Sequence, residues 1–398
     1  MNILRKLFFY IYIVLWMSYY LQNLLMIKGT VAQVLVVIVL AMSFYTFFAV
    51  NLNYKTGAFL KWLNIMLFVT SIYGIIPIIG GWSLTGFWQQ ETTSTHIYLQ
   101  RTYQSILPIY AFYYFTLKGQ ITEKAITYLF FAFLIYSILM YYSNYMVHFE
   151  KSGKEEITNN MGYYFVPLIP MLFLVKMRDL WKYLLVIVIM AYVMMAMKRG
   201  AILIGVVMLL LFMCYHFKNI SWKRSIYISL LSAIVITAAY KFTLDLYDSS
   251  SYFRHRVEQT QEGRTSHRDE IYTSYFEYFS DRTSPTEFII GNGANATVAL
   301  LGNYAHNDWL EFAINHGIIG VIMYLIYWIM FVGEWKNYRG PTMCRWALGA
   351  LIIGYFMKGL YSMSFDAMPI AATISIGYCL ATGLTYRTLE AFNEEVLE

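Results

Sequence analysis

The residues Lys198-Arg199-Gly200 form a short basic turn between two strongly apolar segments. Two adjacent cations could bind an anion there, because the arginine guanidinium presents a planar fork that matches phosphate oxygens. Gly200 has no side chain, so the backbone could approach such a ligand closely. The alternative is that both basic side chains extend along the apolar surface to lipid headgroups. The turn is therefore a candidate anion site at a membrane surface.

A second group of polar residues surrounds His306 and follows a glycine turn at 291–293. The run reads His306-Asn307-Asp308-Trp309-Leu310-Glu311. Asp308 with Glu311 three residues later fits a capping box, which predicts that a helix begins here. That pattern leaves His306 unexplained, and an imidazole is near neutral at physiological pH and can accept a proton. His306 is therefore the candidate general base.

Other chemistries lack the residues that they need. The sequence has no H-E-x-x-H zinc motif, no G-x-x-x-x-G-K-[ST] nucleotide loop and no G-x-S-x-G nucleophile elbow. Its three cysteines, Cys214, Cys344 and Cys379, lie in or beside apolar segments and form no C-x-x-C pair. We therefore expect no metal and no cofactor. The net charge of +6 is scattered over short loops, which indicates membrane orientation and not nucleic-acid binding.

The composition is that of a membrane protein. Hydrophobic residues make up 59% of the 398 residues, and charged residues make up 13%, about half the roughly 25% of soluble proteins. A membrane helix needs about 20 mostly apolar residues, and about twelve segments qualify. They are 7–26, 31–50, 59–79, 102–118, 125–147, 161–176, 180–197, 200–217, 225–243, 310–333, 344–361 and 367–386. We therefore predict an all-α polytopic membrane protein with one domain over residues 1–398.

One large polar loop, residues 244–309, separates the ninth and tenth segments. Placing the N-terminus in the cytoplasm puts more than half of the Lys and Arg residues on the cytoplasmic side, as the positive-inside rule requires. Both termini are then cytoplasmic, and the large loop lies outside together with the turn at 198–200. Within the loop, residues 269–279 have helical spacing. The apolar face of that helix would carry Ile271, Tyr275, Tyr278 and Phe279. We expect the loop to form a small folded cap on the membrane surface.

The order of these motifs resembles the signature of the O-antigen ligase and polymerase superfamily. Proteins of that family have about a dozen helices, in a GT-C-like arrangement, and one large outer loop late in the chain. The matching positions are Arg199 and Gly200, Arg268 and Tyr272, Gly291 and Gly293, His306-Asn307-Asp308-Trp309-Leu310-Glu311, and Gly317 and Gly320. Tyr272 stands where the family more often has tryptophan. The main resemblance covers residues 264–325, whereas residues 1–190 match only in helix pattern.

The resemblance implies an inverting, metal-independent glycosyltransferase whose donor is a glycan on undecaprenyl pyrophosphate. In that scheme His306 is the general base on the acceptor hydroxyl, and Arg199 and Arg268 bind the pyrophosphate. Further candidates are Lys198, Arg264 and Arg101 for the pyrophosphate and Tyr272, Asn307 and Glu311 as supporting residues. The implied partners are the lipid-linked oligosaccharide, membrane lipids and a chain-length regulator protein.

Four functions remain open, of which the last is a non-catalytic membrane scaffold, in which Arg199, Arg268 and His306 would be replaceable. The first is a polymerase of a bacterial surface polysaccharide, O-antigen or capsule, in the cytoplasmic (inner) membrane with its active site on the periplasmic face. The second is the ligase that moves the finished chain to lipid A–core with the same residues. The third is a twelve-helix transporter or flippase, which should carry ionisable residues at mid-membrane depth; the first nine segments have almost none. We expect the polymerase, because such enzymes are numerous and varied in sequence.

Overall fold

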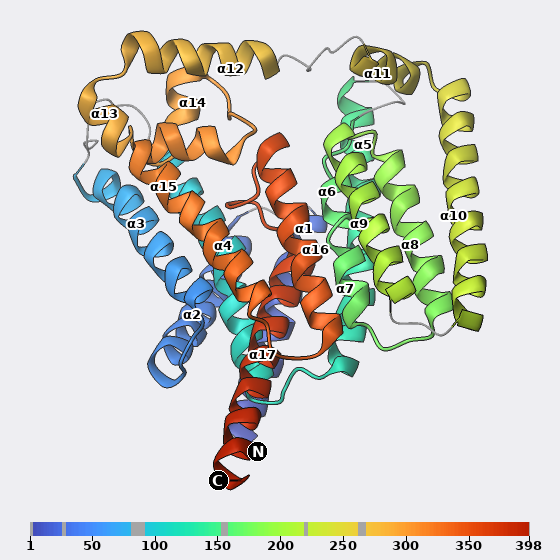
Figure 1. The fold of residues 1–398 in the computed structure, drawn as a ribbon. Coiled ribbons are helices and arrows are strands. Elements are labelled where there is room, and N and C mark those ends of the chain that lie inside the picture. The colour runs from blue at the N-terminus through green and yellow to red at the C-terminus, as the bar shows by residue number, and fades with distance from the viewer. Residues whose placement is uncertain are drawn as a thin grey trace.

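The computed structural model describes residues 3–25, 29–80, 92–152, 158–218, 222–261 and 268–397. Every regular element in these ranges is helical (Figure 1). The first ten helices are α1 (Ile3–Leu24), α2 (Thr30–Asn53), α3 (Ala58–Gly80), α4 (Thr92–Leu117), α5 (Glu123–Ser152), α6 (Gly162–Phe165), α7 (Leu168–Leu174), α8 (Asp179–Met195), α9 (Arg199–Lys218) and α10 (Trp222–Ser249). The others are α11 (Ser251–Gln261), α12 (Arg268–Glu277), the π-helix η1 (Tyr278–Arg282), α13 (Pro285–Ile290), α14 (Ala296–Leu301), α15 (Asp308–Lys336), α16 (Thr342–Tyr361) and α17 (Ile370–Leu397).

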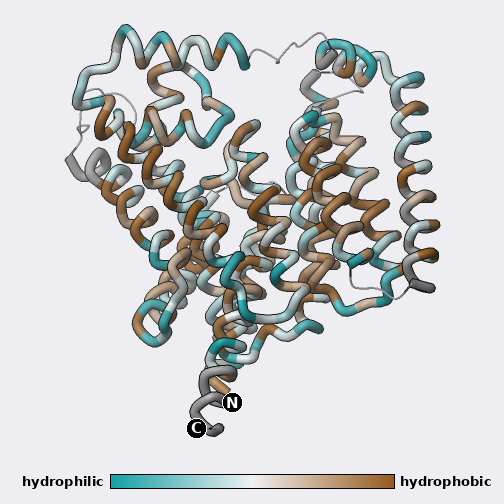
Figure 2. Tube along the Cα trace, in the orientation of Figure 1, coloured by the Kyte–Doolittle hydropathy of each residue, from teal (hydrophilic) through white to brown (hydrophobic). Residues whose placement is uncertain are grey.

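Five of the described helices are long and apolar enough to cross a membrane. These spans are Thr30–Asn53, Ala58–Ile75, Glu123–Val147, Arg199–Lys218 and Asp308–Lys336. Figure 2 shows apolar residues along the middle of the upright helices and polar residues towards the top and bottom of the molecule. The chain therefore has the build of a polytopic membrane protein. The number of crossings, the single-domain assignment and the sidedness stay predictions.

Each predicted apolar segment overlaps a helix, with corrections to three boundaries. The segment 161–176 consists of two short helices, α6 and α7, because Pro167 between them has no N–H to donate. The polar loop begins at Ser250 and not at Leu244, since α10 continues to Ser249. The helix after the loop starts at Asp308.

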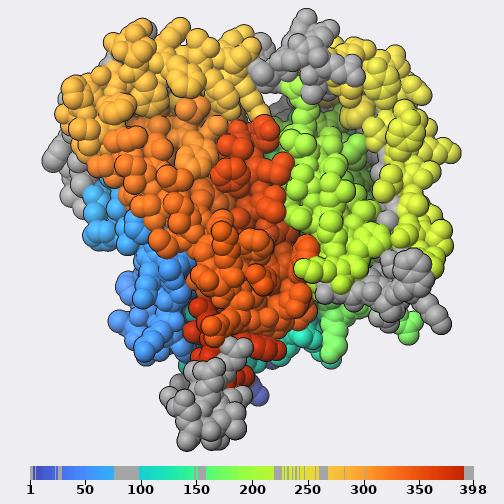
Figure 3. Space-filling view, viewed as in Figure 1, coloured from blue at the N-terminus to red at the C-terminus, as the bar shows by residue number. Residues whose placement is uncertain are grey.

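The helices α11 to α14 form a cap at one end of the molecule, and both described chain ends lie at the other end (Figure 1). Helix α16 packs against α7, α9, α15 and α17. In Figure 3 it lies in the centre of the face shown, between the orange helix α15 and the green helices. This helix therefore links the part of the chain that carries Arg199 to the part that carries His306.

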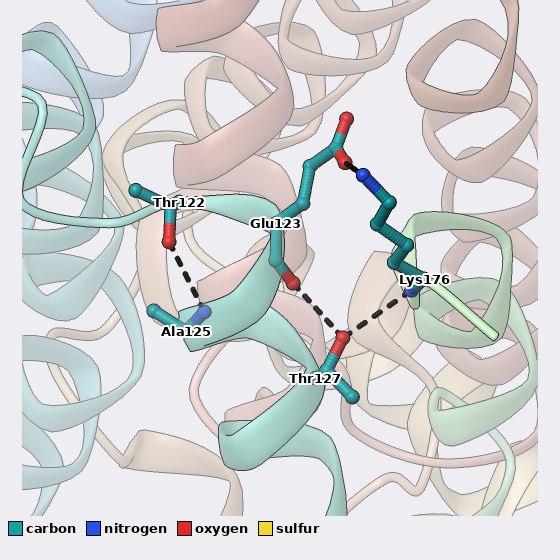
Figure 4. A network of polar contacts seen from close by, with 5 residues as sticks. All are labelled: Thr122, Glu123, Ala125, Thr127 and Lys176. Carbon is teal, nitrogen blue, oxygen red and sulfur yellow. Dashed lines mark hydrogen bonds and ion pairs between the residues drawn. The ribbon is translucent and has the colours of Figure 1, made fainter.

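A small polar network fixes the beginning of α5 to the segment after α7, away from the cap (Figure 4). The Lys176 ammonium lies 3.6 Å from a carboxylate oxygen of Glu123. The Thr127 hydroxyl donates to the Glu123 carbonyl at 2.9 Å and accepts from the Lys176 N–H at 3.2 Å. Both charged side chains are largely exposed, so the pair contributes little beyond positioning.

The predicted cap helix is present as α12 and continues into the π-helix η1. Its four predicted apolar residues belong to a second, smaller hydrophobic core. That core is built from Tyr275, Tyr278, Ala296, Ala305 and Ile314, with Ile271, Phe279, Leu300 and Leu310 packed against it. Because Ala305 and Ile314 flank the start of α15, the cap is packed onto the segment that carries His306.

Candidate active site

Helix α15 is capped by Asn307 and not by Asp308, so the predicted capping box is wrong. The Asn307 side-chain oxygen accepts hydrogen bonds from the backbone N–H groups two and three residues further on, at 2.9 and 3.4 Å. Asp308 is buried and accepts from the Ser364 N–H and hydroxyl and from the Tyr324 hydroxyl. A carboxylate with these partners ties the start of α15 to the turn after α16.

Glu311 is a structural residue of the loop that carries His306. One carboxylate oxygen accepts a hydrogen bond from the Ala305 N–H at 2.7 Å, and the other accepts from the Thr297 hydroxyl at 2.7 Å. The side chain is buried. A capping-box glutamate would reach the N–H of the N-cap residue, whereas this one reaches a residue two positions earlier. Glu311 thus holds the cap to α15.

His306 is held between two anchored neighbours. The Ala305 N–H donates a hydrogen bond to the Glu311 carboxylate, and the Asn307 side-chain amide donates one to the Leu360 carbonyl at 3.4 Å. The backbone of His306 has a φ of 51°, in the left-handed region that non-glycine residues seldom occupy. Such a conformation persists only where the surroundings impose it, and it is common at functional sites. The half-buried imidazole is therefore placed by its backbone.

Two predicted basic residues lie near the His306 ring. Partial burial lowers the pKa of His306 below its ordinary value, and the positive charges of Lys198 and Arg268 lower the pKa further. Lys198 comes from the turn before α9, and Arg268 is the first residue of α12. Residues about a hundred positions apart in the chain therefore place positive charge near the imidazole, which is neutral and able to accept a proton at physiological pH.

Arg199 begins α9, and Gly200 behind it is packed against α6. A Cβ atom at Gly200 would collide with the Tyr163 hydroxyl. That hydroxyl lies close to Arg268, although the two are not aligned as a hydrogen bond. The turn that carries Lys198 and Arg199 and the first turn of α12 are therefore neighbours, and Gly200 is required for this close approach.

Arg101 reaches the same loop from α4. Its guanidinium donates to the Tyr304 hydroxyl at 2.9 Å and lies 5.7 Å from the centre of that ring. Tyr304 is two residues before His306. Tyr272 approaches from the other side, where its hydroxyl makes a long contact of 3.5 Å with the Leu360 carbonyl, the group that also accepts from Asn307. Arg264 lies outside the described residues.

The glycine turn of the loop packs directly on a kink in α15. Gly317 has φ 62° and ψ −159° inside the helix, and a Cβ atom there would lie 2.5 Å from the Ile289 carbonyl oxygen. Gly291 has φ 78°, and a Cβ atom there would lie 2.6 Å from the Asn315 carbonyl carbon. Backbone therefore touches backbone, with hydrogen bonds from the Asn292 and Gly293 N–H groups to carbonyls of α15 at 2.8 and 2.9 Å.

A family model described as O-antigen ligase matches residues 184–325. This segment resembles the O-antigen ligase family. The matched segment runs from α8 into α15 and contains Lys198, Arg268 and His306. The resemblance seen in the sequence is confirmed, whereas the family does not separate a polymerase from a ligase. No curated protein matches the chain.

The matched segment places a neutral imidazole near the positive charges of Lys198 and Arg268. A neutral imidazole can take a proton from a hydroxyl, and guanidinium and ammonium groups can stabilise an anionic leaving group. This pairing suits the attack of a sugar hydroxyl on a carbon that bears a phosphate leaving group. The roles of the individual residues stay predictions.

Two residues beside this cluster were not singled out by sequence reasoning as parts of the site. Tyr163 lies in an apolar run and has no distinguishing neighbour in the sequence. Lys358 lies in the last turn of α16 and is buried, with its ammonium donating to the Ala367 carbonyl at 2.7 Å. A lysine inside an apolar segment was the one available signal, because buried charges in membrane helices are costly.

Glu311 accepts from Ala305, Thr297 and, at 3.5 Å, the Asn315 amide, and the first two of these hydrogen bonds predict a difference between two substitutions. Glu311→Gln should keep most of the activity, because the amide oxygen can accept from Ala305 while its NH₂ donates to the Thr297 hydroxyl with the direction reversed. Glu311→Ala leaves the buried Ala305 N–H without a partner, at a cost of about 1–3 kcal/mol, and should lose most activity. Transfer assays and thermal unfolding of both variants measure this. Equal inactivation of the two would indicate that the carboxylate itself takes part in the chemistry.

The charge of Lys198 predicts the pH dependence of transfer. His306 must be neutral to accept a proton, so the rate falls as the pH drops through its pKa. Because Lys198 lowers that pKa, Lys198→Met should raise it and move the acid limb of the kcat/KM profile to higher pH. Lys241→Met, on the exposed surface of α10, is the matched control. An acid limb that stays in place in Lys198→Met would contradict the assignment of His306 as the titrating base.

Proposed function

We propose that this protein is a polymerase of a bacterial surface polysaccharide, O-antigen or capsule. The observation that carries the proposal is the positive charge of Lys198 and Arg268 near His306 in a segment that matches the O-antigen ligase family model. The donor is a glycan on undecaprenyl pyrophosphate, and the acceptor is the non-reducing end of a lipid-linked repeat unit. The site lies in the inner membrane on its periplasmic face.

The proposed step is an inverting transfer. The acceptor hydroxyl oxygen attacks the anomeric carbon of the donor sugar, and its proton passes to the His306 imidazole. The new glycosidic bond forms as the bond between that carbon and the pyrophosphate oxygen breaks, and the lipid pyrophosphate leaves with the electron pair. Arg199, Arg268 and Lys198 neutralise the departing charge, a role that falls to a metal ion in many transferases.

The alternative is the ligase, which is the activity that the family description names. It uses the same donor and the same residues and differs only in the acceptor, lipid A–core. The polymerase is favoured because polymerases are numerous and varied in sequence.

Purified protein in lipid nanodiscs, supplied with the lipid-linked repeat unit of its host, tests the proposal. A polymerase makes a ladder of longer glycans from the repeat unit alone. A ligase makes product only after lipid A–core is added, which would replace our proposal with the alternative. Movement of the lipid-linked glycan across the bilayer with no new glycosidic bond would overturn both in favour of a transporter.

A further inference from the structure

A second pair of polar groups lies beside the basic turn. Tyr163 on α6 has 6% of its surface exposed, and its hydroxyl touches Gly200. Lys358 on α16 has 7% of its surface exposed. The Lys358 ammonium lies 5.6 Å from the centre of the Tyr163 ring, so the ring face helps to hold the cation in place.

The Tyr163 hydroxyl has an unused hydrogen-bonding capacity. It is buried and forms no hydrogen bond with the described residues, although Arg268 and Ser362 are close. A buried hydroxyl without a partner costs about 1–3 kcal/mol. Its position at the Arg199-Gly200 step makes the space beside Arg268 the natural place for a partner. An acceptor oxygen bound there would contact the hydroxyl and the guanidinium together.

The Lys358 ammonium also has N–H groups that no described residue accepts. It has three N–H groups, and within the described residues it donates one hydrogen bond, to Ala367. Asp308 and Asp366 are near enough to attract it, but neither forms a direct ion pair with it in the described part of the chain. Asp308 is already engaged by Ser364 and Tyr324. Two N–H groups of Lys358 therefore remain for a ligand.

An apolar groove leads from this pair into the helix bundle. Tyr163 and Lys358 form its polar end, and its free volume is about 20 Å³, close to the space that one water molecule needs. The walls include Pro170, Ile204, Met208, Leu351 and Gly354. From Tyr163 to Pro170 on one wall the groove extends roughly 10 Å, at about 1.5 Å per helical residue.

We infer that Tyr163 and Lys358 bind the lipid-side phosphate of a polyprenyl pyrophosphate. The inference rests on the proposed function and adds two binding residues to it. Arg268 and Lys198, which lie nearest His306, then contact the sugar-side phosphate. The two layers of hydrogen-bonding groups orient the lipid-linked glycan, with its anomeric carbon at the imidazole and its lipid towards the membrane.

Farnesyl phosphate and farnesyl pyrophosphate are suitable probes, because one carries only the lipid-side phosphate and the other carries both. Their binding to the full-length protein in nanodiscs is measured for the wild type, Tyr163→Phe, Lys358→Met and Arg268→Gln. Tyr163→Phe should weaken the binding of both probes by about 2- to 10-fold, and Lys358→Met by about 10- to 100-fold. Arg268→Gln should weaken both probes, and the pyrophosphate more than the monophosphate, because Arg268 lies between the two phosphates.

The control is Tyr128→Phe, because Tyr128 is an exposed tyrosine of α5 and its substitution should leave both affinities unchanged. Tyr163→Phe keeps the ring beneath Lys358, so it reports on the hydroxyl even if Lys358→Met fails to fold. Unchanged monophosphate binding in Tyr163→Phe would overturn the inference while leaving the proposed function intact. A wild type that binds neither probe and transfers no glycan would overturn the proposed function itself.

Discussion

Replacing His306 with asparagine should reduce glycan transfer by about 100- to 10,000-fold, the usual contribution of a general base. Asparagine is the informative substitution because it tolerates the left-handed backbone that His306 adopts with φ 51°. It therefore keeps the loop in place and removes only the group that accepts the proton. In a host that depends on this protein, a surface-glycan gel gives the readout alongside the membrane level of each variant.

The pattern of loss on the gel also identifies the reaction. A polymerase without its base leaves a single repeat unit on the lipid core in place of the ladder. A ligase without its base leaves no glycan on the core and accumulates lipid-linked polymer. His255→Ala is the matched control, since His255 is an exposed histidine of α11. A full ladder from a well-expressed His306→Asn variant would remove His306 as the base and reopen the transporter function.

Features that depend on local patterns could be predicted from the sequence. A turn joins two helices close to the predicted position, because the apolar runs on both sides are long enough to fix it; the turn lies at 196–198, and Arg199 and Gly200 already belong to α9. The helix at 269–279 is present because its apolar spacing matches one helical face. The signature residues Arg268 and His306 fall in the segment that matches the O-antigen ligase family.

Features that depend on contacts between distant segments could not be predicted. Asn307, Asp308 and Glu311 all fit a local helix start, and their division of roles is decided by Ser364, the Leu360 carbonyl and Thr297. A capping box uses only neighbours in sequence, so it assigned the cap to the wrong residue. The sequence likewise marks Gly291 and Gly317 as turn and helix residues, and only the fold shows that their backbones touch.

Tyr163 shows a second limit. Its residue type is ordinary for an apolar helix, and nothing beside it in the sequence is unusual. Its place in the proposed site comes from the packing of α6 against Gly200 and from α16, which holds the Lys358 ammonium over the Tyr163 ring. Tyr163, Gly200 and Lys358 come from three segments that are far apart in the chain. No spacing pattern in the sequence could therefore reveal Tyr163.

Replacing Gly317 with alanine should detach the cap from α15 and abolish transfer, although the protein should still insert in the membrane. Gly317 has φ 62° and ψ −159°, a conformation that is almost exclusive to glycine and costs about 1–3 kcal/mol for other residues. The added methyl group would also meet the Ile289 carbonyl oxygen at 2.5 Å and the Gly291 nitrogen at 2.6 Å. Because both neighbours are backbone atoms, no side-chain rotation relieves the collision.

Gly333→Ala is the matched control for Gly317→Ala, because it lies in the same helix with nothing within 4 Å of the added Cβ atom. It should leave transfer unchanged and stabilise α15 by up to about 1 kcal/mol, the difference in helix propensity between the two residues. Limited proteolysis of the purified proteins separates the two outcomes, since a detached cap is cut faster while the membrane helices stay protected. Wild-type transfer and an intact cap in Gly317→Ala would show that the glycine contact does not position His306.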